Sequence, residues 1–169
     1  MDTPAANPTL DRLFRHMAWA NAQFLAELVK LPVENLTLAA EDDEWTVGAI
    51  CEHLVRSASG YAAHLDGGSR LEEIRIPTTQ EEVAGLAEFC AGFDARLREA
   101  ALLPDMVTFR VREGQRITRM RSTVLAQSIH HSIEHRAQIA GILSKSGIKA
   151  IDLDAIDVWG LGDAEGLNE

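Results

Sequence analysis

Three histidines stand within six residues in the segment AQSIHHSIEHRAQIAGIL, which spans residues 126–143. The apolar residues around them recur at intervals of three and four, which is typical of an amphipathic α-helix. On a helical wheel, His131 and His135 lie one turn apart on one flank of the apolar stripe, whereas His130 points away from it. Two imidazoles at this spacing can bind one metal ion. We therefore predict that His131 and His135 are a ligand pair and that His130 lies on the surface.

Two other interpretations of this segment compete with an open metal site. In the first, the two imidazoles are structural and are satisfied by neighbouring Ser and Gln side chains on a half-buried face. In the second, the string HSIEH is the HxxEH pattern of inverted zinc proteases, with Glu134 as the base. Such proteases use a larger scaffold and a distal acidic ligand, so a chain of 169 residues disfavours the second interpretation.

A second helical segment, VGAICEHLVRSASGYAAHL, offers two candidates for a third ligand. His53 flanks the apolar stripe, and His64 has nearly the same azimuth eleven residues later. A rise of 1.5 Å per residue separates the two by roughly 16 Å along the axis, so one ion can take only one of them. One such histidine and the pair would give three nitrogen ligands and leave one coordination position open, which is the arrangement of catalytic zinc.

Other polar residues near the pair are candidates for supporting or catalytic roles. Gln138 adjoins the pair, and Arg136 falls on the apolar stripe, where it either supports the site or spans the core to an acid. Glu52 and Glu134 could assist from outside the ligand set, although a solvated face is the simpler interpretation of both. The stripe itself is predicted to consist of Leu125, Ile129, Ile133, Ala140 and Leu143.

Four segments with helical periodicity must position these residues. The first segment lies between Pro8 and Pro32, and the second begins near Thr46 and ends at Gly67–Gly68. The third begins after Pro77, with Thr78 or Thr79 as its cap, and the fourth runs from about Ser122 to Lys145. Four helices of roughly 20 residues with one longer crossover predict an all-α four-helix bundle.

The crossover before the fourth helix has the pattern of a short β-hairpin. Val107, Phe109 and Val111 alternate with polar residues, and REGQ supplies a turn. The acidic tail after the fourth helix contains Gly, with Trp159 as its one large anchor. We expect one domain over residues 1–169, with flexible ends at 1–8 and about 160–169.

Composition excludes several classes of function. The formal net charge is −10, and the arginines between residues 110 and 121 alternate with apolar residues, so we expect no nucleic-acid partner. No apolar run approaches the ~20 residues that span a bilayer. Cys51 and Cys90 are not paired in a CxxC motif and are predicted to be small core residues in a cytoplasmic protein.

The quoted segments resemble the DinB/YfiT family of metal-dependent helical bundles, over nearly the whole chain. HSIEHRAQIAGIL resembles the signature of the fourth helix, in which two ligand histidines four apart precede Arg, a small residue, Gln and Ile. WTVGAICEHLVRSASGY is similar to the second helix, and HMAWANAQFLAEL resembles the first. The family pattern often has a further His at the position of Gln127.

The resemblance implies an up-down-down-up bundle, often a homodimer, that holds a divalent ion such as zinc or nickel. Carried over residue by residue, the ligands are His53, His131 and His135. Relatives include thiol S-transferases that use bacillithiol or mycothiol and a mycothiol-dependent maleylpyruvate isomerase. In such enzymes the metal can hold a thiolate and lower the pKa of the thiol.

We therefore expect a metal-dependent enzyme that activates water or a low-molecular-weight thiol for attack on a small electrophile. The alternative is a non-catalytic metal-binding or stress-response module, dimeric, with structural histidines. A homodimer also follows from the wide apolar stripe of the first helix and from Trp19 and Trp159, which one bundle cannot fully cover.

Overall fold

The computed structural model describes residues 7–40, 45–71 and 73–166, which are mostly helical. Its elements, in chain order, are α1 (Pro8–Lys30), the 3₁₀ helix η1 (Val33–Thr37), α2 (Val47–Asp66), α3 (Gln80–Ala101), β1 (Val107–Arg112), β2 (Gln115–Met120), α4 (Arg121–Lys145) and α5 (Val158–Ala164). The four helices and the hairpin predicted from periodicity are thus confirmed as elements. None of the described helices is long and apolar enough to cross a membrane.

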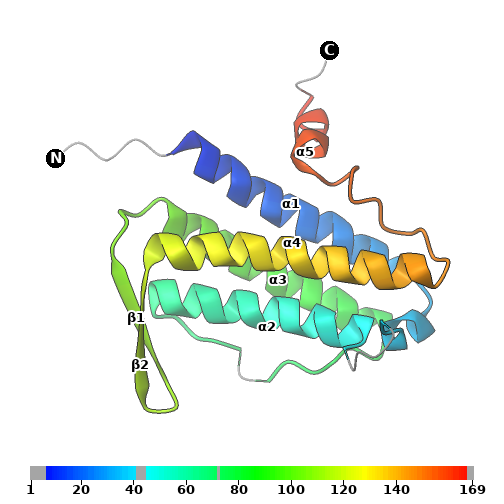
Figure 1. Ribbon diagram of the computed structural model, residues 1–169, viewed down its shortest axis with the longest axis horizontal. Helices are drawn as coiled ribbons and strands as arrows, with labels where there is room; N and C mark the ends of the chain where they lie inside the picture. The colour runs from blue at the N-terminus through cyan, green and yellow to red at the C-terminus, as the bar shows by residue number, and fades with distance from the viewer. Residues whose placement is uncertain (1–6, 41–44, 72, 167–169) are drawn as a thin grey trace.

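The long helices α1, α2, α3 and α4 lie side by side (Figure 1). Both α1 and α2 pack against α3 and against α4. Cys51 and Cys90 are free and buried in the core between them, as predicted. The largest fully buried side chains come from all four helices and include Phe14, Phe24, Ile50, Leu97, Ile139 and Leu143.

Capping residues fix where the helices begin and end. The Thr46 hydroxyl accepts a hydrogen bond from the Ala49 N–H at 3.1 Å and starts α2, and the Thr79 hydroxyl caps α3 in the same way. Gly67 ends α2 at a φ of 70°, a left-handed conformation that favours glycine. Because Thr46 fixes the start of α2, it also fixes the position of His53 two turns later.

The buried face of α4 differs from the predicted stripe. Leu125, Ile129 and Leu143 are buried, but Ile133 is 46% exposed, so its assignment to the core is wrong. Ser128 and Ser132, which are not among the predicted stripe residues, are buried. Both hydroxyls are satisfied in the core, because Ser132 donates to the side-chain oxygen of Asn21 on α1 and Ser128 donates to the carbonyl oxygen of Leu125, each at 2.7 Å.

The hairpin lies at the end of the helical body where α2 ends and α4 begins (Figure 1). Its strands pair antiparallel, with Val107 opposite Met120 and Arg112 opposite Gln115. Glu113 and Gly114 form the turn with φ values of 50° and 75°, as a tight hairpin turn of type I′ requires. Thr108 is buried toward α2.

The tail folds back along α1 and ends in the short helix α5. Asp157 caps α5 by accepting a hydrogen bond from the Gly160 N–H at 2.8 Å. Arg12 and Arg15 of α1 both pair with Glu165. Trp159 is 82% exposed, so the prediction that it anchors the tail is wrong; Leu161 is buried there instead. Of the ends predicted to be flexible, residues 1–6 and 167–169 lie outside the described part of the chain.

Candidate metal centre

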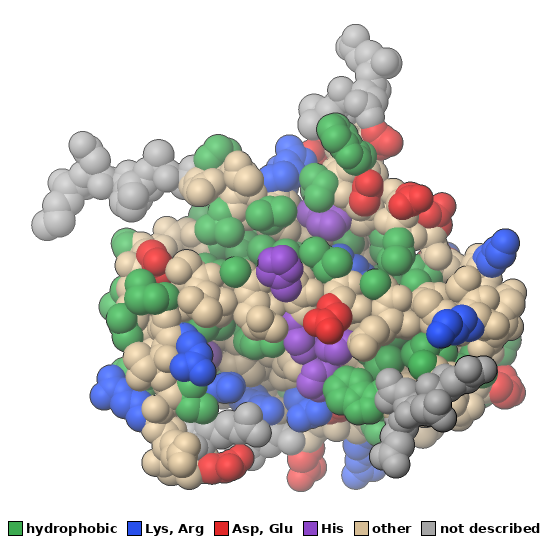
Figure 2. Space-filling model, in the orientation of Figure 1, with side chains coloured by type: hydrophobic (Ala, Val, Ile, Leu, Met, Phe, Trp, Pro, Cys, Tyr) green, Lys and Arg blue, Asp and Glu red, His purple; other side chains and the backbone are tan. Residues whose placement is uncertain are grey.

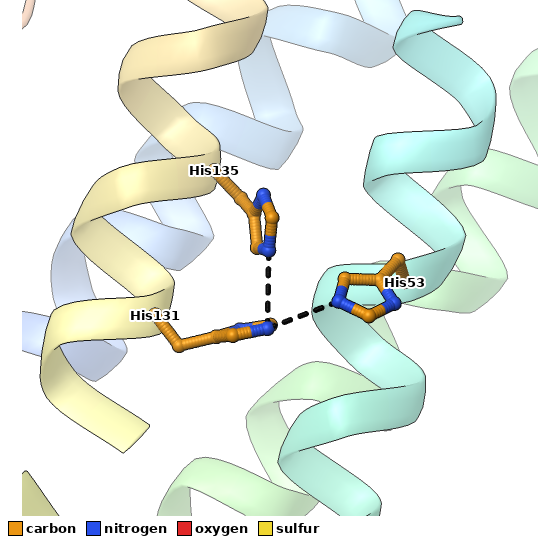
Figure 3. Close-up of side chains that lie close together, drawn as sticks. All are labelled: His53, His131 and His135. Atoms are coloured by element: carbon orange, nitrogen blue, oxygen red, sulfur yellow. Dashed lines mark hydrogen bonds between the residues drawn. The ribbon is translucent and has the colours of Figure 1, made fainter. Parts of the chain in front are cut away.

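Helices α2 and α4 pack against each other and bring three predicted ligands together. His53 lies on the α2 face that meets α4, and His131 and His135 lie one turn apart on the α4 face that meets α2. The three imidazole rings point toward one another across this interface (Figure 3). Histidine side chains also reach the surface between α2 and α4 (Figure 2), so the group is open to solvent on one side.

The Nε2 atoms of the three rings converge. The Nε2 atom of His131 lies 3.0 Å from Nε2 of His53 and 3.0 Å from Nε2 of His135. One potential ligand atom from each ring lies within 4.8 Å of the other two. A tetrahedral zinc with nitrogen ligands at about 2.0–2.1 Å separates those nitrogens by roughly 3.3 Å. The donor set and its spacing therefore fit one ion with small side-chain adjustments.

Two imidazoles of the site, those of His53 and His131, have lowered pKa values. Burial, and then the proximity of His135 and His53, lowers the pKa of His131 from 6.5 to about 4. Burial lowers the pKa of His53 as well, helped by His135 and by the guanidinium of Arg56. A neutral imidazole has the free electron pair that a metal needs. These two rings can therefore act as ligands at neutral pH without first losing a proton.

Residues 1–159 match the model of the DinB family. The chain belongs to the DinB family. Among proteins of curated function, none matches this chain. The family match supports the metal-site interpretation of the histidine group, whereas the substrate has to be inferred from the residues around it.

Side chains outside the group orient two of the three histidines in this DinB-family protein. The Nδ1 atom of His135 is hydrogen-bonded to the side-chain oxygen of Gln138, so Nδ1 carries the proton and Nε2 is left free. On α2, Arg56 donates to Glu52 at 2.6 Å, and its guanidinium lies 3.4 Å from Nδ1 of His53. Glu52 is only 8% exposed, so its interpretation as part of a solvated face is wrong.

Two aromatic rings border the histidine group. The ring of Trp45 meets the ring of His53 nearly edge-on, with centroids 4.7 Å apart, and lies 6.0 Å from the ring of His135. The ring of Tyr61 meets that of His131 edge-on at 5.6 Å. Both aromatics stand in the quoted segment WTVGAICEHLVRSASGY, but the wheel of α2 gave no reason to assign them to the site.

Arg136 belongs to a different cluster, in the core. Its guanidinium donates to the side-chain oxygens of Asn21 and Ser132, and Asn21 donates to Asp94 at 2.9 Å. Burial raises the pKa of Asp94 to about 6 and lowers the pKa of Arg136 to about 10. Of the two roles considered for Arg136, this geometry favours the link across the core to an acid.

Glu134 is exposed and is not part of the histidine group. The inverted-protease interpretation also needs a distal carboxylate as its third ligand. Among the described residues, the third member of the group is His53 instead.

Two of the remaining histidines, His16 and His64, have partners elsewhere in the fold. His64 is buried beside the hairpin, where its Nε2 atom lies 3.0 Å from the hydroxyl of Thr108. His16 is buried with its Nε2 atom 2.9 Å from the carbonyl oxygen of Ile156. His130 is exposed on α4, as predicted. The structure thus selects His53 over His64 as the α2 member of the group.

Proposed function

We propose that this DinB-family protein is an enzyme that binds one divalent ion, zinc or nickel, through His53, His131 and His135. The observation that carries the proposal is the convergence of the three Nε2 atoms at the interface of α2 and α4. A structural zinc site is closed by four protein ligands, whereas catalytic sites have three and keep one position open. A site with three histidine ligands and no fourth protein ligand in the group, within the described part of the chain, therefore favours a catalytic metal site over a structural one.

The proposed chemistry is activation of a low-molecular-weight thiol or a water for attack on a small electrophile. When bound, the ion would supply positive charge that three neutral imidazoles do not compensate, and this favours a thiolate or hydroxide as the fourth ligand. Gln138 would hold the His135 ring in its ligand tautomer. Trp45 and Tyr61 would limit the access of water to the ion.

We also propose that the four long helices form the up-down-down-up bundle of the family. In Figure 1, α1 and α4 run in one direction and α2 and α3 in the other, which supports this topology. A homodimer is proposed as well. Its support is the exposure of large apolar residues, Ile133 at 46% and Trp159 at 82%.

Cobalt substitution tests the proposed function. Cobalt(II) added to metal-free protein should give a visible spectrum at one equivalent per chain, and 2-mercaptoethanol should change that spectrum by binding as a thiolate. His53→Ala should lose the response. Failure to take up cobalt contradicts the metal site. Uptake without a thiol response would favour the non-catalytic metal-binding module.

A further inference from the structure

A cavity of about 380 Å³ opens beside the proposed metal centre, between the hairpin, α2 and α4. This volume lies in the range of small-molecule sites, about 300–1,000 Å³. Its polar walls come from all three neighbours: Tyr61 and His64 on α2, Arg110 and Arg119 on the hairpin, and Thr123 and Gln127 on α4. The cavity is the place where the crossover meets the helices, so the hairpin helps to build it.

The charge of the cavity is opposite to that of the whole protein. The formal net charge is −10, yet residues 106–121 contain five arginines and one acid. In the strand register Thr108 faces Arg119 and Arg110 faces Ile117, so both arginines lie on the hairpin face that carries buried Thr108. Lys and Arg side chains gather over the hairpin and the adjoining end of α2 (Figure 2).

The two arginines of the cavity have different surroundings. Arg110 is half-buried, and its Nη1 atom lies 3.6 Å from where a Cβ on Gly60 would stand, so the guanidinium rests on bare α2 backbone. Arg119 is exposed and forms no ion pair with a carboxylate of the described residues. Burial and the nearby Arg110 lower the pKa of His64, so the positive charge at neutral pH comes from the arginines.

The cavity and the histidine group share a wall. Tyr61 lines the cavity and also packs edge-on against the ring of His131 at 5.6 Å. Gln127 lines the cavity from α4. Gln127 precedes His131 by one helical turn, so the two side chains lie on the same side of α4. The side chain of Tyr61 therefore lies between the cavity and the ring of His131.

We propose that this cavity binds the oxyanion, a carboxylate or a phosphate, of a small molecule whose reactive end reaches the three-histidine centre. The second half of this proposal rests on the proposed function; the anion site does not. Guanidinium groups bind oxyanions through paired, charge-assisted hydrogen bonds, and a partly enclosed site strengthens them. The thiol or the electrophile would thus be recognised by its acidic group and positioned by it.

Anion binding to metal-free protein tests the cavity alone. Succinate and inorganic phosphate are each titrated into the protein by calorimetry. The anion that binds more tightly shows whether the cavity prefers a carboxylate or a phosphate. Arg119→Gln should weaken binding about tenfold or more, as loss of a charge-assisted hydrogen bond predicts. Arg110→Gln should act in the same direction, but Arg119 is the cleaner position because its side chain is exposed.

Arg116→Gln is the matched control. Arg116 lies on the same strand, but it stacks over the ring of Phe109 at 3.9 Å on the opposite face of the hairpin. The control removes the same charge and should leave anion affinity nearly unchanged. The proposal is overturned if neither anion binds, if Arg119→Gln binds as tightly as the parent, or if Arg116→Gln weakens binding equally.

A second titration tests the connection to the metal. Cobalt-loaded protein is titrated with mercapto-carboxylates of increasing length and with the mercapto-alcohols of equal length. At one length the carboxylate should bind about tenfold more tightly, and Arg119→Gln should remove that preference. Equal affinities at every length overturn the connection. If the metal-free protein binds the anion but the protein shows no cobalt response, the cavity is still an anion site and the proposed function is contradicted instead.

Discussion

Removal of the His131 imidazole is the sharpest test of the metal centre, because its Nε2 atom lies 3.0 Å from both of the others. Zinc sites with four protein ligands bind with about 10–16 kcal/mol, or about 3 kcal/mol per ligand. His131→Ala should therefore weaken zinc binding more than about a hundredfold. The two nitrogens that remain, from His53 and His135, come from different helices and would hold an ion poorly.

Thermal unfolding with and without zinc measures this loss. At a free zinc concentration of a hundred times the dissociation constant, the ion stabilises the folded state by about 2.7 kcal/mol. For a chain of this size that is a rise in Tm of roughly 5–11 °C. The parent protein should show this rise, and His131→Ala should show almost none at the same zinc concentration.

His130→Ala is the control, because His130 is the adjacent residue on α4 and its side chain is exposed. It should keep both the zinc-induced rise in Tm and one equivalent of metal in elemental analysis. The reasoning is refuted if His131→Ala retains stoichiometric metal, or if His130→Ala loses it to the same degree.

Three further outcomes are expected. Gln138→Ala should weaken zinc binding about 10–100-fold in competition with a chelator, because His135 loses the partner that fixes its tautomer. Burial raises the pKa of Asp94 from 3.8 to about 6, so the folded state holds this proton more tightly and the carboxyl destabilises folding as pH rises between those values. Asp94→Asn should therefore gain stability over the parent across that window, by up to about 3 kcal/mol in urea unfolding, and a constant difference would contradict this. In sedimentation the protein should form a dimer, which a species of 18.5 kDa at micromolar concentration would contradict.

The helix boundaries could be predicted because they depend on local residues. Thr46 caps α2 and Gly67 ends it, and both effects act within a few residues of the chain. The hairpin also follows from a local pattern, since its turn at Glu113 and Gly114 needs only a short segment. The short helix α5 was missed because its seven residues include two glycines and show too little periodicity to detect.

The buried face of α4 could not be predicted from α4 alone. A wheel ranks residues by their own hydrophobicity and so placed Ile133 in the core. The buried face instead contains Ser132 and Arg136, whose polar atoms are satisfied by Asn21 on α1. A polar side chain is buried when it meets such a partner, and the partner stands more than a hundred residues away in the sequence.

The candidate site was predictable in part for the same reason. The spacing of His131 and His135 places two ligands on one face without any tertiary information. The choice of His53 over His64 depends on how the hairpin packs against α2. The hydroxyl of Thr108 on the hairpin lies 3.0 Å from Nε2 of His64, so this imidazole already has a partner. On the wheel of α2 the two histidines are nearly equivalent, so only the fold or the family pattern separates them.

The position of the histidine group also bears on what holds α2 and α4 together. Where the two helices meet at the site, α2 presents one imidazole and α4 presents two in place of aliphatic side chains, so this part of the interface gains little from apolar burial. Burial and the neighbouring histidines lower the pKa of His131 to about 4, so this ring is neutral at neutral pH. An ion bound to all three Nε2 atoms would join the two helices and replace the missing hydrophobic contacts. Metal binding and the stability of the α2–α4 interface are therefore expected to be linked.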